Sequence, residues 1–134
     1  NAIRAGGMRL DFPDGWLDEA RAFCDDFPAR LKEYDTLLKT NRIWMGRTKD
    51  IGVISGERAL AYGLTGPCLR ASGVNYDVRK AMPYEAYADM DFDVPLGSVG
   101  DTYDRYLVRL EEMRQSRLII LLAMENLPDG PIMT

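Results

Sequence analysis

Residues 101–128 of the chain read DTYDRYLVRLEEMRQSRLIILLAMENLP, and this is its most regular stretch. Apolar residues recur there at steps of three and four, which is the spacing of one face of a helix. Arg117 interrupts this face, and Pro128 ends it because proline cannot continue a helix. The apolar positions are Tyr103, Tyr106, Leu110, Met113, Ile120 and Met124. The pattern predicts one long helix, around which the rest of the fold is arranged.

The start of this helix is marked by polar residues. Ser98, with Asp101 three positions later, resembles a capping box, in which the two residues accept each other's backbone N–H groups. Asp101 and Asp104 also place negative charge at the positive end of the helix dipole. We therefore expect Ser98 to cap the helix.

A second long helix is predicted between Asp14, as its cap, and Leu38. Pro28 lies inside it, so we expect a kink or break near Phe27. Lys39 and Asn41 are typical of a helix end. The predicted buried face consists of Trp16, Ala20, Phe23, Phe27, Leu31, Tyr34 and Leu38.

The remaining segments are short. Residues 1–13 predict an extended N-terminal segment, residues 42–54 a loop, and residues 90–95 a brief strand or extended lead-in. Ser55 is expected to cap a short helix over residues 56–62. Residues 66–87, rich in Gly, Pro and Tyr, predict irregular backbone with at most one helical turn. The expected fold is mainly α: two long antiparallel helices, a short helix and this irregular segment, with little or no β.

The bulk properties fit one folded domain. The chain has 134 residues, of which 46% are hydrophobic and 28% charged, as is ordinary for folded proteins. It begins without methionine and stops in a linker-like stretch, so we expect residues 1–134 to be a single domain excised from a larger subunit. The formal charge of −4 argues against a nucleic-acid partner, because nucleic-acid footprints are usually basic.

Several kinds of site lack the residues that they need. There is no histidine, the commonest general base and nitrogen metal ligand. Cys24 and Cys68 form no CxxC pair, so we expect two buried, reduced thiols and no metal site. The apolar run at residues 118–124 is too short to span a bilayer. Neither a glycine-rich phosphate loop nor a hydrolase triad is present, so we expect no catalytic residue in this chain.

Charged residues concentrate in two places. In residues 66–87, two arginines and an aspartate stand among tyrosines, which favour burial, and arginine suits planar burial beside carboxylates and rings. The final helix carries a second set with ordered spacing. Our hypothesis is that one charge network joins both places. Its members are Arg70, Asp77, Arg79, Asp104, Arg105, Arg109 and Glu112.

Two plainer interpretations of these charges stay open. The helical charges would form weak ion pairs on a solvated face, and the group in residues 66–87 would only hold irregular backbone in place. The helical pairs three or four positions apart are Asp101 with Arg105, Arg109 with Glu112, and Glu111 with Arg114.

Blocks along nearly the whole chain resemble the D-type subunit of the proton-pumping NADH-quinone oxidoreductase, respiratory complex I. They are IRAGGMRLDFPDGW, NRIW, RTKDIGVIS, YGLTGPCLRASGVNYDVRK, PYEAY, FDVPLGSVGDTYDRYLVRLEEMRQS and LPDGPI. The block from Phe92 to Ser116 is specific to this family. The pattern R-x-S-G followed by D-x-R is shared with the large subunits of nickel-iron hydrogenases, to which the D-type subunit is related.

The resemblance implies a protein of the peripheral arm, on the cytoplasmic side of the bacterial inner membrane. It implies a quinone chamber beside an iron–sulfur cluster held by a neighbouring subunit. Our own hypothesis, which rests on residue spacing, is that the charge network lies near that chamber. The family's quinone-contacting histidine and tyrosine precede this segment, so the chain is expected to be scaffold that binds no cofactor itself. The expected partners are the other peripheral-arm subunits and, in the intact complex, quinone. The apolar run at residues 118–124 also predicts self-association.

Two other functions stay open. A membrane-bound nickel-iron hydrogenase large subunit would carry paired CxxC motifs elsewhere in the parent chain. A non-catalytic module that docks neighbouring subunits would lose assembly, rather than turnover, when its charge network is altered. The electron donor and the quinone type are not encoded in these residues.

Overall fold

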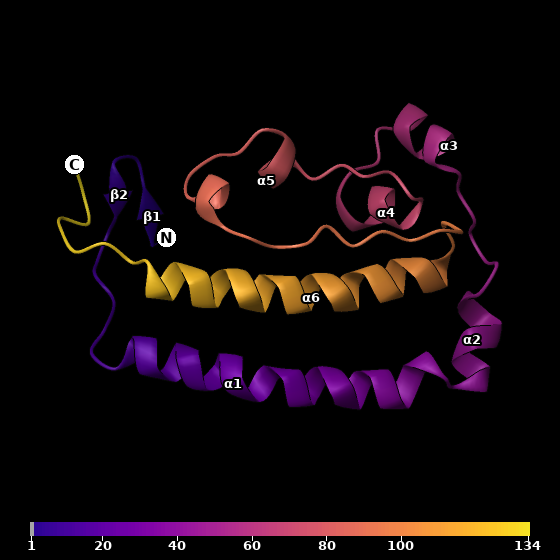
Figure 1. Cartoon of the computed structure of the whole chain (residues 1–134), viewed down its shortest axis with the longest axis horizontal. Helices are drawn as coiled ribbons and strands as arrows, with labels where there is room; N and C mark the ends of the chain where they lie inside the picture. The colour runs from indigo at the N-terminus through magenta and orange to yellow at the C-terminus, as the bar shows by residue number, and fades with distance from the viewer. Residues whose placement is uncertain (1) are drawn as a thin grey trace.

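The computed structural model describes residues 2–134, so residue 1 of the expected N-terminal segment lies outside the described residues. Two long helices run antiparallel along the molecule, α1 at Trp16–Tyr34 and α6 at Thr102–Glu125 (Figure 1). A π-helical turn, η1 at Asp35–Lys39, continues α1. Figure 1 shows α6 in the middle, with α1 along one side, the short helices α3 (Gly56–Ala61), α4 (Gly66–Ala71) and α5 (Val78–Ala81) along the other, and α2 (Arg42–Thr48) at one end. This confirms the predicted mainly helical fold with a long antiparallel pair.

The start of α6 differs from the prediction by one turn. Asp101, not Ser98, is the N-cap, and its carboxylate accepts the backbone N–H of Asp104 at 2.7 Å. Asp104 accepts the N–H groups of Ser98, Val99 and Gly100 in return. A carboxylate can accept several N–H groups at once, so the pair of aspartates replaces the expected serine.

Helix α1 is continuous through Pro28, so there is no break there, and the alternative of a kink near Phe27 stays a prediction. Its N-cap is Gly15 rather than Asp14. Cys24 and Leu31 are buried, whereas Trp16, Phe23 and Tyr34 are exposed, so the predicted buried face was wrong at those three positions. Successive helical residues differ by about 100° in direction, and the face toward α6 is centred on Cys24 and Leu31.

Residues 42–54 contain a helix that the sequence prediction missed. Helix α2 spans Arg42–Thr48, and the side chain of Asn41 accepts the N–H groups of Ile43 and Trp44. Asn41 thus begins a helix, where we expected it to end one. Ser55 caps α3 at Gly56–Ala61, as predicted.

Residues 66–87 are more helical than expected. Helix α4 spans Gly66–Ala71, the single-turn helix α5 spans Val78–Ala81, and a 3₁₀ turn, η2, spans Tyr87–Asp89. Pro67 lies in the first turn of α4, where its missing N–H costs no hydrogen bond. Residues 90–95 form no strand, although Phe92 is buried.

The ends of the chain meet beside the start of α1. Strands β1, Ile3–Arg4, and β2, Gly7–Met8, form an antiparallel hairpin, the only sheet within residues 2–134. The N–H of Met8 donates to the carbonyl of Ile132 at 2.8 Å. Figure 1 shows the C-terminal segment returning to this hairpin. No helix among the described residues is both long and apolar enough to cross a membrane.

The buried core is small for a chain of this size. The accessible surface is 9449 Å², whereas a compact monomer of this mass exposes about 7,100 Å². Cys24 belongs to the core, and Cys68 is only half-buried, so the prediction of two buried thiols holds for the first alone. The core residues are Cys24, Leu31, Ala59, Leu69, Ala71, Phe92, Val108 and Leu110.

Candidate functional site

Arg70, on α4, lies at the centre of a buried group of charges. Only 8% of its side chain is exposed. Its Nε and Nη2 atoms both lie 2.6 Å from Oε1 of Glu112, on α6, and its Nη1 lies 3.5 Å from Oδ2 of Asp77. Nη1 also donates to the backbone carbonyl of Tyr76 at 3.0 Å. The guanidinium therefore meets two carboxylates and one carbonyl, as its fork of donors allows.

Asp77 is bound still more tightly by a second arginine. Arg79 donates Nε–H to Oδ1 at 2.9 Å and Nη2–H to Oδ2 at 2.6 Å, a bidentate pair. Asp77 also caps α5 by accepting the backbone N–H of Arg79 at 3.0 Å. The hydrogen bonds from the Arg79 side chain lower the pKa of Asp77 below its ordinary value, although burial acts in the opposite direction. This carboxylate is therefore held ionised.

Together these side chains make a cluster that we call the Arg70 network: Arg70, Asp77, Arg79 and Glu112. It holds two positive and two negative groups, so its net charge is zero. Its members come from α4, α5 and α6. The ion pairs among them link these three helices. A shielded, balanced set of charges can polarise without a net gain or loss of charge.

Aromatic rings cover one side of the Arg70 network. The guanidinium carbon of Arg79 lies 4.7 Å from the ring centroid of Phe92 and 5.8 Å from that of Tyr87. The Nζ of Lys80 lies 4.4 Å from the same Phe92 ring. These cation–π contacts keep water from part of the network. Tyr87 is one of the tyrosines expected to favour burial of these charges. The network hypothesis named neither Lys80 nor Phe92, and Phe92 follows the charged segment in sequence and is brought back to it only by the fold.

The other three residues of the hypothesis lie outside the Arg70 network. Asp104 accepts backbone N–H groups at the start of α6. Arg105 donates to the carbonyl of Gly52 at 3.2 Å and to that of Gly100 at 2.9 Å. Arg109 donates to the carbonyl of Arg105 at 3.1 Å and to Sγ of Cys68 at 3.4 Å. Among the described ion pairs, neither Arg105 nor Arg109 meets a carboxylate.

Of the expected helical pairs, one is formed. Arg114 pairs with Glu111 at 2.8 Å and reaches Asp35, at the end of α1, at 2.6 Å. Asp101 is engaged as a cap, and Glu112 is engaged by Arg70, so neither takes its expected partner. Across residues 2–134, no three His, Cys, Asp or Glu side chains gather in a way that could hold a metal ion.

Comparisons with known proteins agree along the whole chain. The family model for respiratory-chain NADH dehydrogenase, 49 kDa subunit, matches residues 1–134. The second D-type subunit of NADH-quinone oxidoreductase from Thermodesulfovibrio yellowstonii is 54% identical over 131 residues, covering 98% of this chain and 33% of that protein. The second C/D-type subunit from Aquifex aeolicus is 55% identical over 129 residues, covering 96% of this chain and 22% of that protein. The D-type subunit from Anaplasma marginale is 52% identical over 132 residues, covering 98% of this chain and 33% of that protein. The chain spans about a third or less of these relatives.

Proposed function

The chain belongs to the family of the 49 kDa subunit of respiratory-chain NADH dehydrogenase, and we propose that it is a scaffold part of the quinone-reducing D-type subunit of an NADH-quinone oxidoreductase. The observation that carries this proposal is the family match over residues 1–134, together with identities above half to proteins named as D-type subunits. In the parent complex, electrons pass from NADH to quinone and protons are translocated. The chain alone is inactive.

The Arg70 network is the part of this scaffold that we assign to the quinone chamber. Reduction of a quinone changes charge and takes up protons, so buried groups nearby must respond to the change. Arg70 meets Asp77 on one side and Glu112 on the other, so a shift at α5 reaches α6 through one guanidinium. Asp104, Arg105 and Arg109 extend the charged face of α6 toward its start. The histidine and tyrosine that meet the quinone, and the iron–sulfur cluster, belong to other parts of the complex.

This assignment places the chain in the peripheral arm, on the cytoplasmic side of the membrane, with the other peripheral-arm subunits as its partners. We treat residues 1–134 as one domain, because α6 packs against both α1 and α4. In isolation the exposed apolar residues of α6, among them Leu118 and Ile120, favour self-association.

A second candidate function, docking of neighbouring polypeptide, is favoured by the exposed area. The surface exceeds that of a compact monomer by roughly 2,300 Å², and a standard interface takes about 800 Å² from each partner. Helix α1 exposes Phe23 and Tyr34, and η1 exposes Leu37. Docking and the scaffold function are compatible, but they predict different effects of changes in the Arg70 network. A module that only docks would lose assembly, whereas a scaffold of the quinone chamber would assemble and turn over slowly.

The first experiment is on the parent complex, purified from membranes. NADH-driven quinone reduction is measured alongside nickel content by elemental analysis. Quinone reduction by a complex without nickel is the expected result. Nickel together with hydrogen turnover would overturn the proposal and move the chain to the hydrogenase branch.

A further inference from the structure

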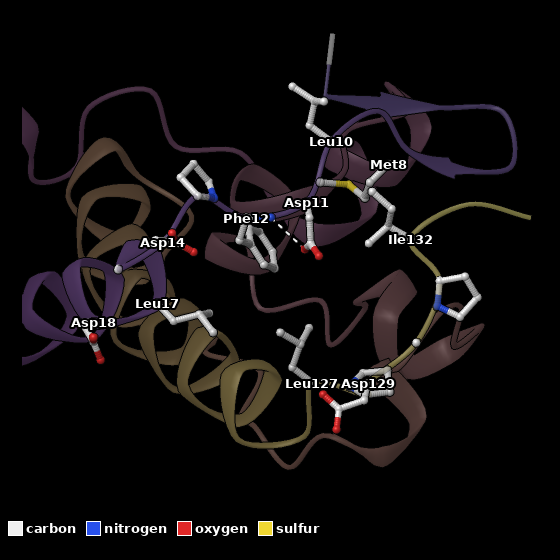
Figure 2. Close-up of a pocket in the computed structure, with 15 residues that line it drawn as sticks. Met8, Leu10, Asp11, Phe12, Asp14, Leu17, Asp18, Leu127, Asp129 and Ile132 are labelled. Atoms are coloured by element: carbon white, nitrogen blue, oxygen red, sulfur yellow. Dashed lines mark hydrogen bonds between the residues drawn. The ribbon is translucent and has the colours of Figure 1, made fainter.

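A groove lies between the segment that leads into α1 and the segment that follows α6 (Figure 2). Its volume is about 840 Å³. One wall is formed by residues 8–18, and the other by residues 127–132. The Arg70 network contributes no lining residue, so this groove is separate from the site described above.

Apolar side chains form part of the floor and walls of the groove. Its apolar side chains include Met8, Leu10, Phe12, Leu17, Leu127 and Ile132. Leu10 is 70% exposed, so residues 2–134 leave this surface uncovered. Phe12 stacks on Trp16, with ring centroids 4.4 Å apart and planes 7° from parallel. This stack gives one wall a rigid aromatic face.

The charged residues of the groove all have the same sign. Four carboxylates line it, those of Asp11, Asp14, Asp18 and Asp129, and no lysine or arginine does. Asp11 accepts the N–H of Phe12 at 2.8 Å. Among the described ion pairs, none involves these four aspartates. A groove with four unneutralised carboxylates attracts cations and repels anionic surfaces such as phospholipid or nucleic acid.

The two walls are fixed to each other by the backbone. The N–H of Met8 donates to the carbonyl of Ile132 at 2.8 Å, and the N–H of Thr134 donates to the carbonyl of Gly6 at 2.9 Å. Gly7, at φ 140°, lies so close to Ile132 that a Cβ there would overlap its carbonyl oxygen. The groove is therefore held open before any partner binds, which lowers the ordering cost of docking.

We propose that this groove docks a polypeptide segment of a neighbouring subunit that presents lysine or arginine side chains on either side of an aliphatic one. The apolar walls would bury the aliphatic side chain, and the aspartates would pair with the flanking cations. A small-molecule site would enclose most of its ligand, whereas side chains such as Leu10 lie open here. The proposal rests on the proposed function, which makes the chain part of an assembly of several proteins.

The test uses the isotope-labelled chain and two synthetic peptides, acetyl-Lys-Leu-Lys-Leu-Lys-amide and its counterpart with glutamate in place of lysine. Binding is followed by NMR shifts of the backbone amides. The lysine peptide is expected to shift resonances of residues 8–18 and 127–132, and to bind about tenfold more weakly when NaCl rises from about 50 to about 500 mM. The glutamate peptide is expected not to bind.

A matched pair of variants tests the aspartates. The triple variant Asp14→Asn, Asp18→Asn, Asp129→Asn is expected to weaken lysine-peptide binding about tenfold. The control Asp25→Asn, Asp26→Asn, Glu33→Gln removes three exposed carboxylates of α1 and is expected to leave the affinity unchanged. If the triple variant does not fold, the comparison of the two peptides on the unaltered chain decides.

Three results would overturn the proposal. The first is equal binding of both peptides, or no binding of either. The second is binding of hexylamine as tightly as the lysine peptide, which would make the groove a site for small cations. The third is concentration-dependent shifts of the groove resonances without peptide, which would mean that a second copy fills it. This titration does not measure quinone reduction. A failure of the docking proposal can therefore be distinguished from a failure of the proposed function.

Discussion

Arg70 and Glu112 lie 42 positions apart in the chain, yet Nη2 of the arginine is 2.6 Å from Oε1 of the glutamate. The contact joins the short helix α4 to the middle of α6. Both side chains are largely buried. The consequences of removing it, or its neighbours, can be measured.

Asp77→Asn should strongly destabilise the fold. The change leaves two arginines facing a neutral amide, and breaking a buried ion pair costs about 3 to 5 kcal/mol. Urea unfolding measures the loss. The control is Asp26→Asn, which breaks an exposed pair with Arg30 and should cost less than about 1 kcal/mol. Equal losses in both variants would show that Asp77 is not a buried partner.

Asp77→Asn and Glu112→Gln should not be additive. Both carboxylates meet Arg70, and residues that share one partner couple by about 0.5 to 3 kcal/mol. A double-mutant cycle of unfolding free energies measures this coupling. Additive losses within about 0.5 kcal/mol would contradict a network connected through Arg70.

The fold should lose stability in acid partly through Asp104. Burial acts to raise the pKa of this carboxyl, but the N–H groups of Val99, Ser98 and Gly100 lower it below its ordinary value. A group with a lowered folded-state pKa contributes stability above its unfolded value of about 3.9, and this is lost as pH falls through the folded value.

Asp104→Asn should therefore be less stable than the unaltered chain at neutral pH, and its stability should fall less steeply below about pH 4. Urea midpoints across that range give the slope. Glu57→Gln, at an exposed position, is the control and should keep the original slope. If Asp104→Asn loses stability in acid more steeply than the unaltered chain, the predicted direction of this pH dependence is wrong.

Gly97→Ala should destabilise the chain, whereas Gly46→Ala should not. The N–H of Gly97 donates to the carbonyl of Arg70 at 2.9 Å, and a Cβ there would overlap the backbone of Ala71. Gly46 lies in α2, where a Cβ would meet nothing within 4 Å, so alanine should add about 0.5 to 1 kcal/mol of helix stability. Thermal unfolding of the two variants should shift in opposite directions.

The sequence was sufficient to predict the long helices because their apolar period runs over many turns. Short helices show no such period and were predicted only where a cap signal was unambiguous, as at Ser55 before α3. Asn41 fits either a helix end or a helix start, and only the backbone distinguishes them. The position of Ser98 shows a related limit, since any of several polar residues can cap a helix and the aspartates accept more N–H groups.

The sequence predicted that charged residues gather at this site, but not which of them pair. The closeness of Asp77 and Arg79 follows from their separation of two residues. The choice of Glu112 as the partner of Arg70 does not, because it depends on which side of α6 meets α4. Arg105 and Arg109 lie on the same helix and instead donate to backbone carbonyls and a thiol sulfur. Packing between helices, which the sequence does not state, decides these partners.

If the Arg70 network supports quinone reduction, Glu112→Gln in the purified parent complex should slow that reaction without preventing assembly. Three quantities are compared with the unaltered complex: the amount of each subunit, the rate from NADH to a water-soluble artificial acceptor, and the rate from NADH to quinone. Asp26→Asn serves as the control. We expect full assembly, unchanged acceptor reduction and quinone reduction slowed about tenfold or more. An assembled variant with undiminished quinone reduction, or a variant that fails to assemble, would contradict this expectation.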